Sequence, residues 1–222
     1  MFPRILPLAI LTLLLAGCAV PFKKRSLLVI GDSNGAAAQG WVAQLQQIRG
    51  GGPLVNTSVS GNTFGFPDDG VERNTLENLT PYLRRGYAEM GAIDEIIIAL
   101  GTNDCKEKFA DRREEIGRHL QTLLQRTRAF FAERGQEVPR IVLVTPPPAG
   151  ADDRVSTEFR GVKACTATLS DFLREIAVGE GYCVADLQQK PGDAVLVHSD
   201  DGIHFTAQGY RMLARSIVSA CY

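Results

Sequence analysis

The stretch SLLVIGDSNG, residues 26–35, is an apolar run that ends in a glycine-flanked turn carrying Ser33. A short apolar run bounded by turn residues is typical of a buried strand. A glycine-flanked turn between a strand and a helix presents either a nucleophilic serine or backbone N–H groups that bind a phosphate. Because the turn has no lysine at the spacing of the Walker A phosphate-binding motif, we favour a nucleophile at Ser33.

The pattern of an apolar run followed by an amphipathic helix recurs along the chain. Further strands are predicted in the segments PLVNTSV (53–59), EIIIAL (95–100), RIVLVT (140–145) and YCVADL (182–187). Helices are predicted over residues 41–48, 76–90, 113–134, 162–178 and 207–219. This alternation indicates a parallel sheet covered on both faces, so we expect an α/β fold, a three-layer αβα sandwich with five strands. In such sheets, ligands bind beyond the carboxyl ends of the strands.

Length and composition suit one globular domain. The chain has 222 residues, of which 45% are apolar and 22% are charged, and its formal net charge is −1. A chain of this size buries roughly 70% of its unfolded surface, which is enough for one core. Because basic residues are not in excess, nucleic acid is not an expected partner.

The N-terminus has the features of an export signal. Arg4 is followed by an apolar stretch from Ile5 to Ala16, which is too short to span a bilayer and has the length of a signal-peptide core. The segment LAGC, ending at Cys18, resembles the lipobox of bacterial lipoproteins, which implies that Cys18 is acylated and attaches the protein to a membrane. The residue after this cysteine is Ala19, which resembles the pattern of lipoproteins sorted to the outer membrane. The domain would then face the periplasm or the cell surface. The alternatives are a secretory signal cleaved nearby and a buried first helix.

Four short segments follow the predicted strands or lie near the C-terminus. They are GDSNG, SVSGNTFG, GTND and DGIHFT, in that order. Together they resemble the SGNH (GDSL-type) serine hydrolases over about residues 26–218, and LGTNDCKEKF and DGIHFT are most similar to the arylesterase-like and carbohydrate-esterase-like branches. The resemblance implies a flavodoxin-like five-stranded parallel sheet and a serine esterase, for which we expect neither cofactor nor metal. Together with the export signal, this resemblance divides the chain into a signal peptide (1–17), a lipidated tether (18–25) and a hydrolase domain (26–222).

A serine nucleophile requires a base. His204 lies two residues before a predicted helix N-cap at Thr206. Asp201, three residues before His204, can accept the imidazole Nδ1–H and leave Nε2 free for Ser33. We therefore expect Ser33, His204 and Asp201 to form a catalytic triad, with Asp200 as an alternative acid that the motif disfavours.

The other two histidines are less well placed. His119 lies within a predicted helix, far from any loop that follows a strand, and is expected to be a surface or packing residue. His198 precedes the DGIHFT segment and remains an outside candidate for the base.

The tetrahedral intermediate of acyl transfer needs N–H donors aimed at its negative charge. The resemblance assigns this oxyanion hole to the Ser33 N–H, the Gly61 N–H and the Asn103 side-chain amide. Glycine permits close backbone approach, and asparagine offers two neutral donors. Asp32 and Asp104 are expected to hold loop geometry through bonds from backbone N–H groups to their side chains.

Four cysteines remain besides Cys18, an even number in a chain expected to be exported. Three pairings are possible, and four buried free thiols are the alternative. We hypothesise that Cys105 pairs with Cys165, which lies near the start of the fourth predicted helix, over residues 162–178. Cys183 would pair with Cys221, because a last helix running back under the sheet would end near the start of the fifth strand.

Substrate contacts are expected in the loops that wall the site. Asn34 stands where the family usually has leucine, and it alters either loop packing or substrate contacts. Asn62 is either a turn residue or a substrate contact. Phe64, Phe66 and Phe159 contact an acyl or aryl group unless they are local packing anchors.

The expected substrates are small esters. The sequence contains no long apolar lid, which favours short acyl chains, such as acetyl esters of carbohydrates or simple aryl esters. A lysophospholipase, a thioesterase or an O-acyltransferase would use the same triad. A flavin- or polysaccharide-binding module without activity is the distant alternative.

Overall fold

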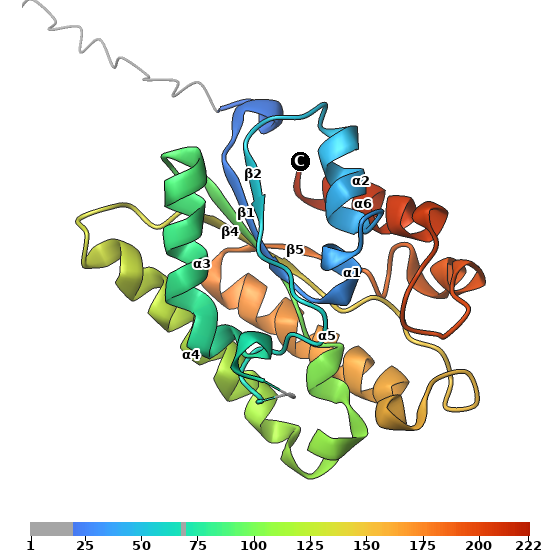
Figure 1. Cartoon of the computed structure of the whole chain (residues 1–222). Coiled ribbons are helices and arrows are strands. Elements are labelled where there is room, and N and C mark those ends of the chain that lie inside the picture. The colour runs from blue at the N-terminus through green and yellow to red at the C-terminus, as the bar shows by residue number, and fades with distance from the viewer. Residues whose placement is uncertain (1–19, 68–69) are drawn as a thin grey trace, which may run out of the picture.

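The protein is an α/β sandwich built on one parallel sheet, as predicted (Figure 1). The computed structural model describes residues 20–67 and 70–222. Five strands pair in parallel in the order β2-β1-β3-β4-β5. Their bounds are β1 Leu27–Gly31, β2 Leu54–Asn56, β3 Glu95–Ala99, β4 Arg140–Val144 and β5 Cys183–Ala185. Because β1 lies between β2 and β3, the loops that follow these three strands are neighbours at the carboxyl edge of the sheet, the edge where the strands end.

Helices cover both faces of the sheet (Figure 1). Helices α2 and α6 pack against Leu27 and Val29 of β1, whereas α3, α4 and α5 pack on the opposite face with Leu28 and Ile30. Successive strand residues point to opposite faces, so β1 is apolar throughout because both faces are covered. The α-helices are α1 Ser33–Ala36, α2 Trp41–Ile48, α3 Thr75–Met90, α4 Glu114–Ala132, α5 Val162–Glu180 and α6 Ala207–Cys221. The 3-10 helices are η1 Phe22–Lys24, η2 Val71–Arg73, η3 Asn103–Cys105, η4 Glu107–Arg112, η5 Thr157–Phe159 and η6 Gly192–His198.

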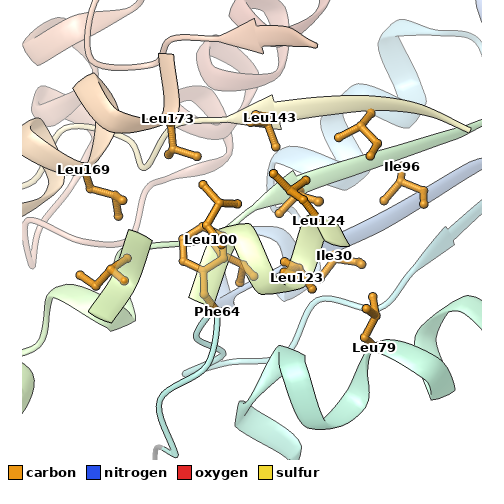
Figure 2. Packing of buried hydrophobic residues seen from close by; sticks show 14 of the residues in the cluster. Ile30, Phe64, Leu79, Ile96, Leu100, Leu123, Leu124, Leu143, Leu169 and Leu173 are labelled. Carbon is orange, nitrogen blue, oxygen red and sulfur yellow. The ribbon is translucent and has the colours of Figure 1, made fainter. Parts of the chain in front are cut away.

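The larger apolar cluster lies between the sheet and α3, α4 and α5. Figure 2 shows Leu79 of α3, Leu123 of α4 and Leu169 of α5 around Ile30 and Leu143 of the sheet. All five side chains are at most 5% exposed. This core packs against one face of the sheet and so fixes the strands from which the loops at the carboxyl edge extend.

The predicted helices lie within two residues of the observed ones at each end. The strands β3 and β4 end one residue earlier than predicted, and β2 and β5 are much shorter than predicted, with three residues each. Both short strands are edge strands with a single partner, and short edge strands are common in native sheets.

The amino edge of the sheet, where the strands begin, holds the chain that enters β1. Arg49 donates to the carbonyl oxygens of Phe22, Lys23 and Arg25 at 3.0, 3.0 and 2.7 Å. The ring of Phe22 stacks on that of Tyr222, the last residue, with centroids 3.7 Å apart. The segment before β1 is therefore fixed to the domain.

Both disulfides have the predicted pairing. Cys105 is bonded to Cys165 and Cys183 to Cys221, with Cα–Cα distances of 5.7 and 5.9 Å. The second bond joins the start of β5 to the end of α6, because α6 runs back towards the amino edge as predicted.

The predicted signal peptide and Cys18 lie outside the described residues. Within residues 20–67 and 70–222, no helix combines the length and apolar character needed to cross a bilayer.

Candidate active site

The turn after β1 carries Ser33 at the first position of α1. Asp32 caps this helix, because its Oδ1 accepts the Asn34 N–H at 3.0 Å. The glycines on either side are required by close packing: a Cβ on Gly31 or Gly35 would lie 2.6 or 2.5 Å from the Ser58 Oγ. The flanking glycines thus let the turn lie directly against the loop that follows β2.

The structure brings the three residues of the predicted triad together. His204 Nε2 lies 2.9 Å from the Ser33 Oγ, and His204 Nδ1 lies 2.7 Å from Asp201 Oδ2. The second carboxylate oxygen, Oδ1, accepts the N–H groups of Ile203 and His204 at 2.9 and 2.7 Å. One loop before α6 therefore holds both the imidazole and the acid that orients it.

The environment of Asp201 favours its ionised form. Burial alone would raise the pKa of this carboxyl, but the backbone N–H and the ring of His204, together with the Ile203 N–H, hold its pKa below the ordinary value. The side chains of His204 and Asp201 are 45% and 54% exposed. The triad therefore lies open at the surface.

The three predicted oxyanion donors lie on the adjacent loops after β1, β2 and β3. Ser33 is the first residue of α1, where helix geometry leaves the N–H without an intrahelical acceptor. Gly61 has φ 82°, a left-handed conformation that favours glycine. The Asn103 side-chain amide donates to the Asn62 carbonyl at 3.1 Å, and an amide group has a second N–H to offer.

Asn62 is a buried structural residue, so the predicted substrate contact is wrong for this side chain. It is 0% exposed, its Nδ2 donates to the Gly31 carbonyl at 3.0 Å, and its Oδ1 accepts the Thr75 hydroxyl at 3.1 Å. With its carbonyl bound to Asn103, Asn62 ties the loops after β1, β2 and β3 to one another. Sequence reasoning had only a turn-forming asparagine to go on, which gives no sign of these distant partners.

The predicted aromatic contacts with substrate are also wrong. Phe64 and Phe66 are 1% and 0% exposed and belong to the core under α4. Phe66 stacks on Phe109 with centroids 4.3 Å apart. Phe159 is 7% exposed and packs beneath the Lys106 ammonium group. These side chains are packing anchors because the loops fold back over the apolar cluster.

Asn34 likewise points inward, away from the predicted substrate contact. It is 2% exposed, and its Oδ1 accepts the hydroxyl of Tyr210 in α6 at 3.1 Å. Asn34 also lines a cavity of about 10 Å³ with Asp32 and Trp41, and its buried Nδ2 bonds no other described residue. A cavity of this size holds one water at most. The asparagine therefore alters loop packing, the other expected role.

Asp32 is a buried carboxyl behind the nucleophile. Burial raises its pKa to about 6, although the Asn34 N–H and the positive charge of His204 both act to lower it. Asp104 holds the neighbouring loop as expected, accepting the Phe64 N–H at 2.9 Å.

Neither of the remaining histidines bonds to a residue of the triad within the described part of the chain. His119, in α4, packs edge-on against the ring of Phe66, and burial lowers the pKa of the His119 imidazole. His198 ends η6, and its carbonyl accepts the Thr206 N–H at 2.8 Å just before α6. Thr206 itself caps α6 as predicted. Within the part of the chain that the structure describes, no group of three or more His, Cys, Asp or Glu side chains could hold a metal ion.

A groove of about 560 Å³ opens at Ser33 and His204. It is lined by Ala36 and Ala37, which follow Ser33, by Ser60 on the loop after β2, and by Thr206 and Ala207 at the start of α6. The floor includes Tyr210 and Phe205, which are 4% and 7% exposed. 

Solved structures of esterases have the same fold. A carbohydrate acetylesterase from Sinorhizobium meliloti is 25% identical, with a TM-score of 0.69 over 88% of this chain and 97% of that chain. The aryl esterase of M. smegmatis is 23% identical, with a TM-score of 0.70 over 88% of this chain and 97% of that chain.

Sequence comparison gives a relative and a family. An acetylxylan esterase from Xylanibacter ruminicola is 28% identical over an alignment of 208 residues, which covers 83% of this chain and 39% of that relative. The chain therefore spans about two fifths of the length of this relative. The model of the GDSL-like lipase/acylhydrolase family matches residues 16–212. This match runs from before β1 into α6 and includes every loop that carries the site, so the chain belongs to the GDSL-like lipase/acylhydrolase family.

Proposed function

We propose that the protein is a serine esterase that hydrolyses short-chain carboxylic esters through an acyl-enzyme on Ser33. The observation that carries the proposal is the continuous chain of contacts from Asp201 through His204 to the Ser33 Oγ, with distances of 2.7 and 2.9 Å. Neutral imidazole can accept the hydroxyl proton through Nε2 only while Nδ1 keeps its hydrogen, and Asp201 holds that tautomer.

In the acylation step, Ser33 Oγ bonds to the ester carbonyl carbon while its proton moves to His204 Nε2. The negative charge on the former carbonyl oxygen faces the N–H groups of Ser33 and Gly61 and the Asn103 amide. The tetrahedral intermediate then collapses: the bond to the alcohol oxygen breaks, and His204 returns the proton to that oxygen. The acyl group is left on Ser33.

Deacylation repeats these transfers with water. His204 takes a proton from a water molecule as its oxygen attacks the acyl carbon, and then gives that proton to the departing Ser33 Oγ. The carboxylic acid leaves, and the free serine is restored. The exposed triad gives water direct access to the acyl-enzyme.

We propose acetyl esters of carbohydrates, or simple aryl esters, as substrates. The groove at Ser33 is open and lined by small or polar side chains such as Ala36, Gln39 and Ser60, surroundings that do not enclose a long acyl chain. The printed names of the relatives, an acetylxylan esterase, a carbohydrate acetylesterase and an aryl esterase, support the same substrates.

A series of p-nitrophenyl esters tests this proposal. Turnover should be fastest at about two to four acyl carbons, because the site at Ser33 is open and does not enclose a longer chain. A fluorophosphonate probe should label the wild type and leave Ser33→Ala unlabelled. An optimum at roughly eight or more carbons would favour a lysophospholipase or thioesterase. Absence of both labelling and hydrolysis would contradict a serine esterase.

We also propose that the enzyme is exported and anchored, by acylation of Cys18, to the outer membrane. The lipobox-like segment LAGC and the two disulfides support this location, because disulfides persist in oxidising compartments. Cys18→Ala should move the protein from the membrane fraction to the soluble fraction. Equal partitioning of the variant and the wild type would contradict the anchor.

A further inference from the structure

The groove beside the triad has a defined direction relative to the reacting atoms. It begins at Ser33 and His204 and continues along Ala36 and Ala37 on one side and Thr206 and Ala207 on the other. Apart from Ser60, on the loop after β2, every residue of the lining follows the nucleophile or lies at or after the histidine in sequence, and neither Gly61 nor Asn103 belongs to the lining. The groove therefore extends from the histidine side of the nucleophile.

The proton pathway decides which half of an ester lies on that side. His204 Nε2, 2.9 Å from the Ser33 Oγ, has to deliver its proton to the oxygen of the leaving alcohol. That oxygen must lie within hydrogen-bonding reach of Nε2. The alcohol half is thus placed against the wall that His204 shares with Phe205, Thr206 and Ala207.

The opposite side of Ser33 is occupied by other groups. The loops after β2 and β3 bring Gly61 and Asn103, and the buried Asn62 packs these loops together through its bonds to Gly31 and Asn103. The ester carbonyl oxygen has to face this side to meet the donors. Neither of these donors lines the groove, which is therefore left for the alcohol.

We infer that the groove between α1 and the start of α6 is the leaving-group site, and that it selects esters of bulky, uncharged alcohols, such as the hydroxyl groups of a carbohydrate chain. This inference rests on the proposed esterase function of Ser33. The groove volume, about 560 Å³, lies within the range of roughly 300–1,000 Å³ that holds ligands of drug size.

The chemistry of the wall favours a neutral alcohol. Of the described residues that line the groove, none is Asp, Glu, Lys or Arg. A phosphate-bearing alcohol would find no lysine or arginine in this lining to pair with, whereas the hydroxyl groups of a sugar can bond Gln39, Ser60 and Thr206. Ala36 and Gln39 are exposed, so a chain can continue beyond the groove into solvent.

The alanine run after the nucleophile supplies a matched pair of variants. Ala36 lines the groove, whereas Ala38, two residues later and also exposed, does not line it. Ala36→Trp should place a bulky side chain in the groove beside Ser33, while Ala38→Trp places the same side chain outside it. Equal thermal unfolding temperatures of both variants and the wild type establish that each is folded.

The substrates keep the acetyl group constant and change the alcohol. We expect Ala36→Trp to lower kcat/KM for acetylated xylo-oligosaccharides by about tenfold or more, through loss of binding to the alcohol half, and to leave methyl acetate within about twofold. Ala38→Trp should change neither substrate. The wild type should also hydrolyse acetylated xylo-oligosaccharides faster than lysophosphatidylcholine.

Other outcomes separate the groove assignment from the proposed function. If Ala36→Trp instead slows methyl butyrate relative to methyl acetate, the groove holds the acyl half and the inference is overturned. An Ala36→Trp variant that behaves like Ala38→Trp, or a wild type that prefers lysophosphatidylcholine, also overturns it while Ser33 remains a labelled nucleophile. A wild type that hydrolyses no ester and takes up no fluorophosphonate contradicts the esterase itself.

Discussion

The buried carboxylates at the two edges of the sheet differ in the cations that surround them. At the amino edge, Glu95 is 0% exposed, and its Oε2 binds Arg25 and Arg140 at 3.2 and 2.6 Å. Just beyond the carboxyl edge, Asp32 is 4% exposed, and no described arginine or lysine bonds it. Its pKa is raised to about 6 by burial, and the cation that acts on it is His204.

The difference distinguishes the amino edge, whose ion pairs stabilise the fold and which we call the holding edge, from the carboxyl edge, which carries the triad and which we call the reacting edge. Arginine remains charged at every accessible pH, so the charge of Glu95 is balanced permanently. His204 gains a proton and gives it up again in each half of the reaction. Charge balance at the carboxyl edge therefore changes during the catalytic cycle, whereas at the amino edge it is fixed.

The largest expected effect is at the reacting edge. Asp201→Asn should lower kcat by about 10⁴-fold, because an amide does not hold the imidazole tautomer that leaves Nε2 free. Steady-state kinetics with p-nitrophenyl acetate measure the effect. Asp200→Asn is the matched control and should leave kcat unchanged. If the two variants lose activity equally, the assignment of Asp201 is wrong.

Removal of an oxyanion donor should have the next largest effect. Asn103→Ala should lower kcat by about 10²–10³-fold and change KM little, because the lost bond forms in the transition state. The same kinetic assay separates kcat from KM. A rise in KM with kcat preserved would show that Asn103 binds ground-state substrate instead.

The pH dependence of stability sharpens the contrast further. The folded-state pKa of Asp32, about 6, lies above the ordinary value of 3.8, so folding disfavours the ionised carboxyl. This contribution to stability is complete below about pH 4 and is lost as the pH rises through 6, a change of about 3 kcal/mol. Asp32→Asn keeps an acceptor for the Asn34 N–H but does not ionise. By urea denaturation, it should be more stable than the wild type at about pH 8, and the two should converge near pH 4.

Asp201→Asn is the control for this titration, because the pKa of Asp201 is shifted down rather than up. A carboxyl whose pKa is lowered by folding stabilises the protein at pH values above its ordinary pKa. That stability is lost as the pH falls through the folded-state pKa. The Asp201 variant should therefore lose stability relative to the wild type at high pH. A pH-independent difference between Asp32→Asn and the wild type would refute the buried, titrating carboxyl.

The smallest expected effect is at the holding edge. Glu95→Gln removes the negative charge shared by Arg25 and Arg140 and should lower the free energy of unfolding by about 2 kcal/mol. Activity at 25 °C should be unchanged, because the ion pairs lie at the far end of the strands from Ser33. Denaturation and kcat are measured on the same preparation. A loss of kcat at unchanged stability would erase the distinction between the two edges.

The sequence predicts the framework because its periodicity is strong. Apolar runs such as EIIIAL are buried on both faces, and their alternation with amphipathic helices leaves one reasonable sheet class. His204 and Asp201 are predicted in contact because both lie on one short loop, so their geometry is local. The disulfide between Cys183 and Cys221 follows from the direction of α6.

Loop side chains resist this reasoning. Phe64 and Phe66 lie in a segment with no helical or strand period, so nothing in the sequence tells an inward from an outward ring. Asn34 bonds Tyr210, 176 residues away, and such a pair leaves no trace in spacing. The raised pKa of Asp32 depends on burial by neighbours that only the folded chain brings together.

The contact between Phe22 and Tyr222 places both ends of the described domain at one edge of the sheet. Domains whose termini are close together and exposed tolerate insertion into longer proteins. Extra domains joined before Val20 or after Tyr222 would attach opposite Ser33 and leave the groove uncovered. The fold is thus suited to serve as a module that is immobilised or fused through either terminus without loss of access to its nucleophile.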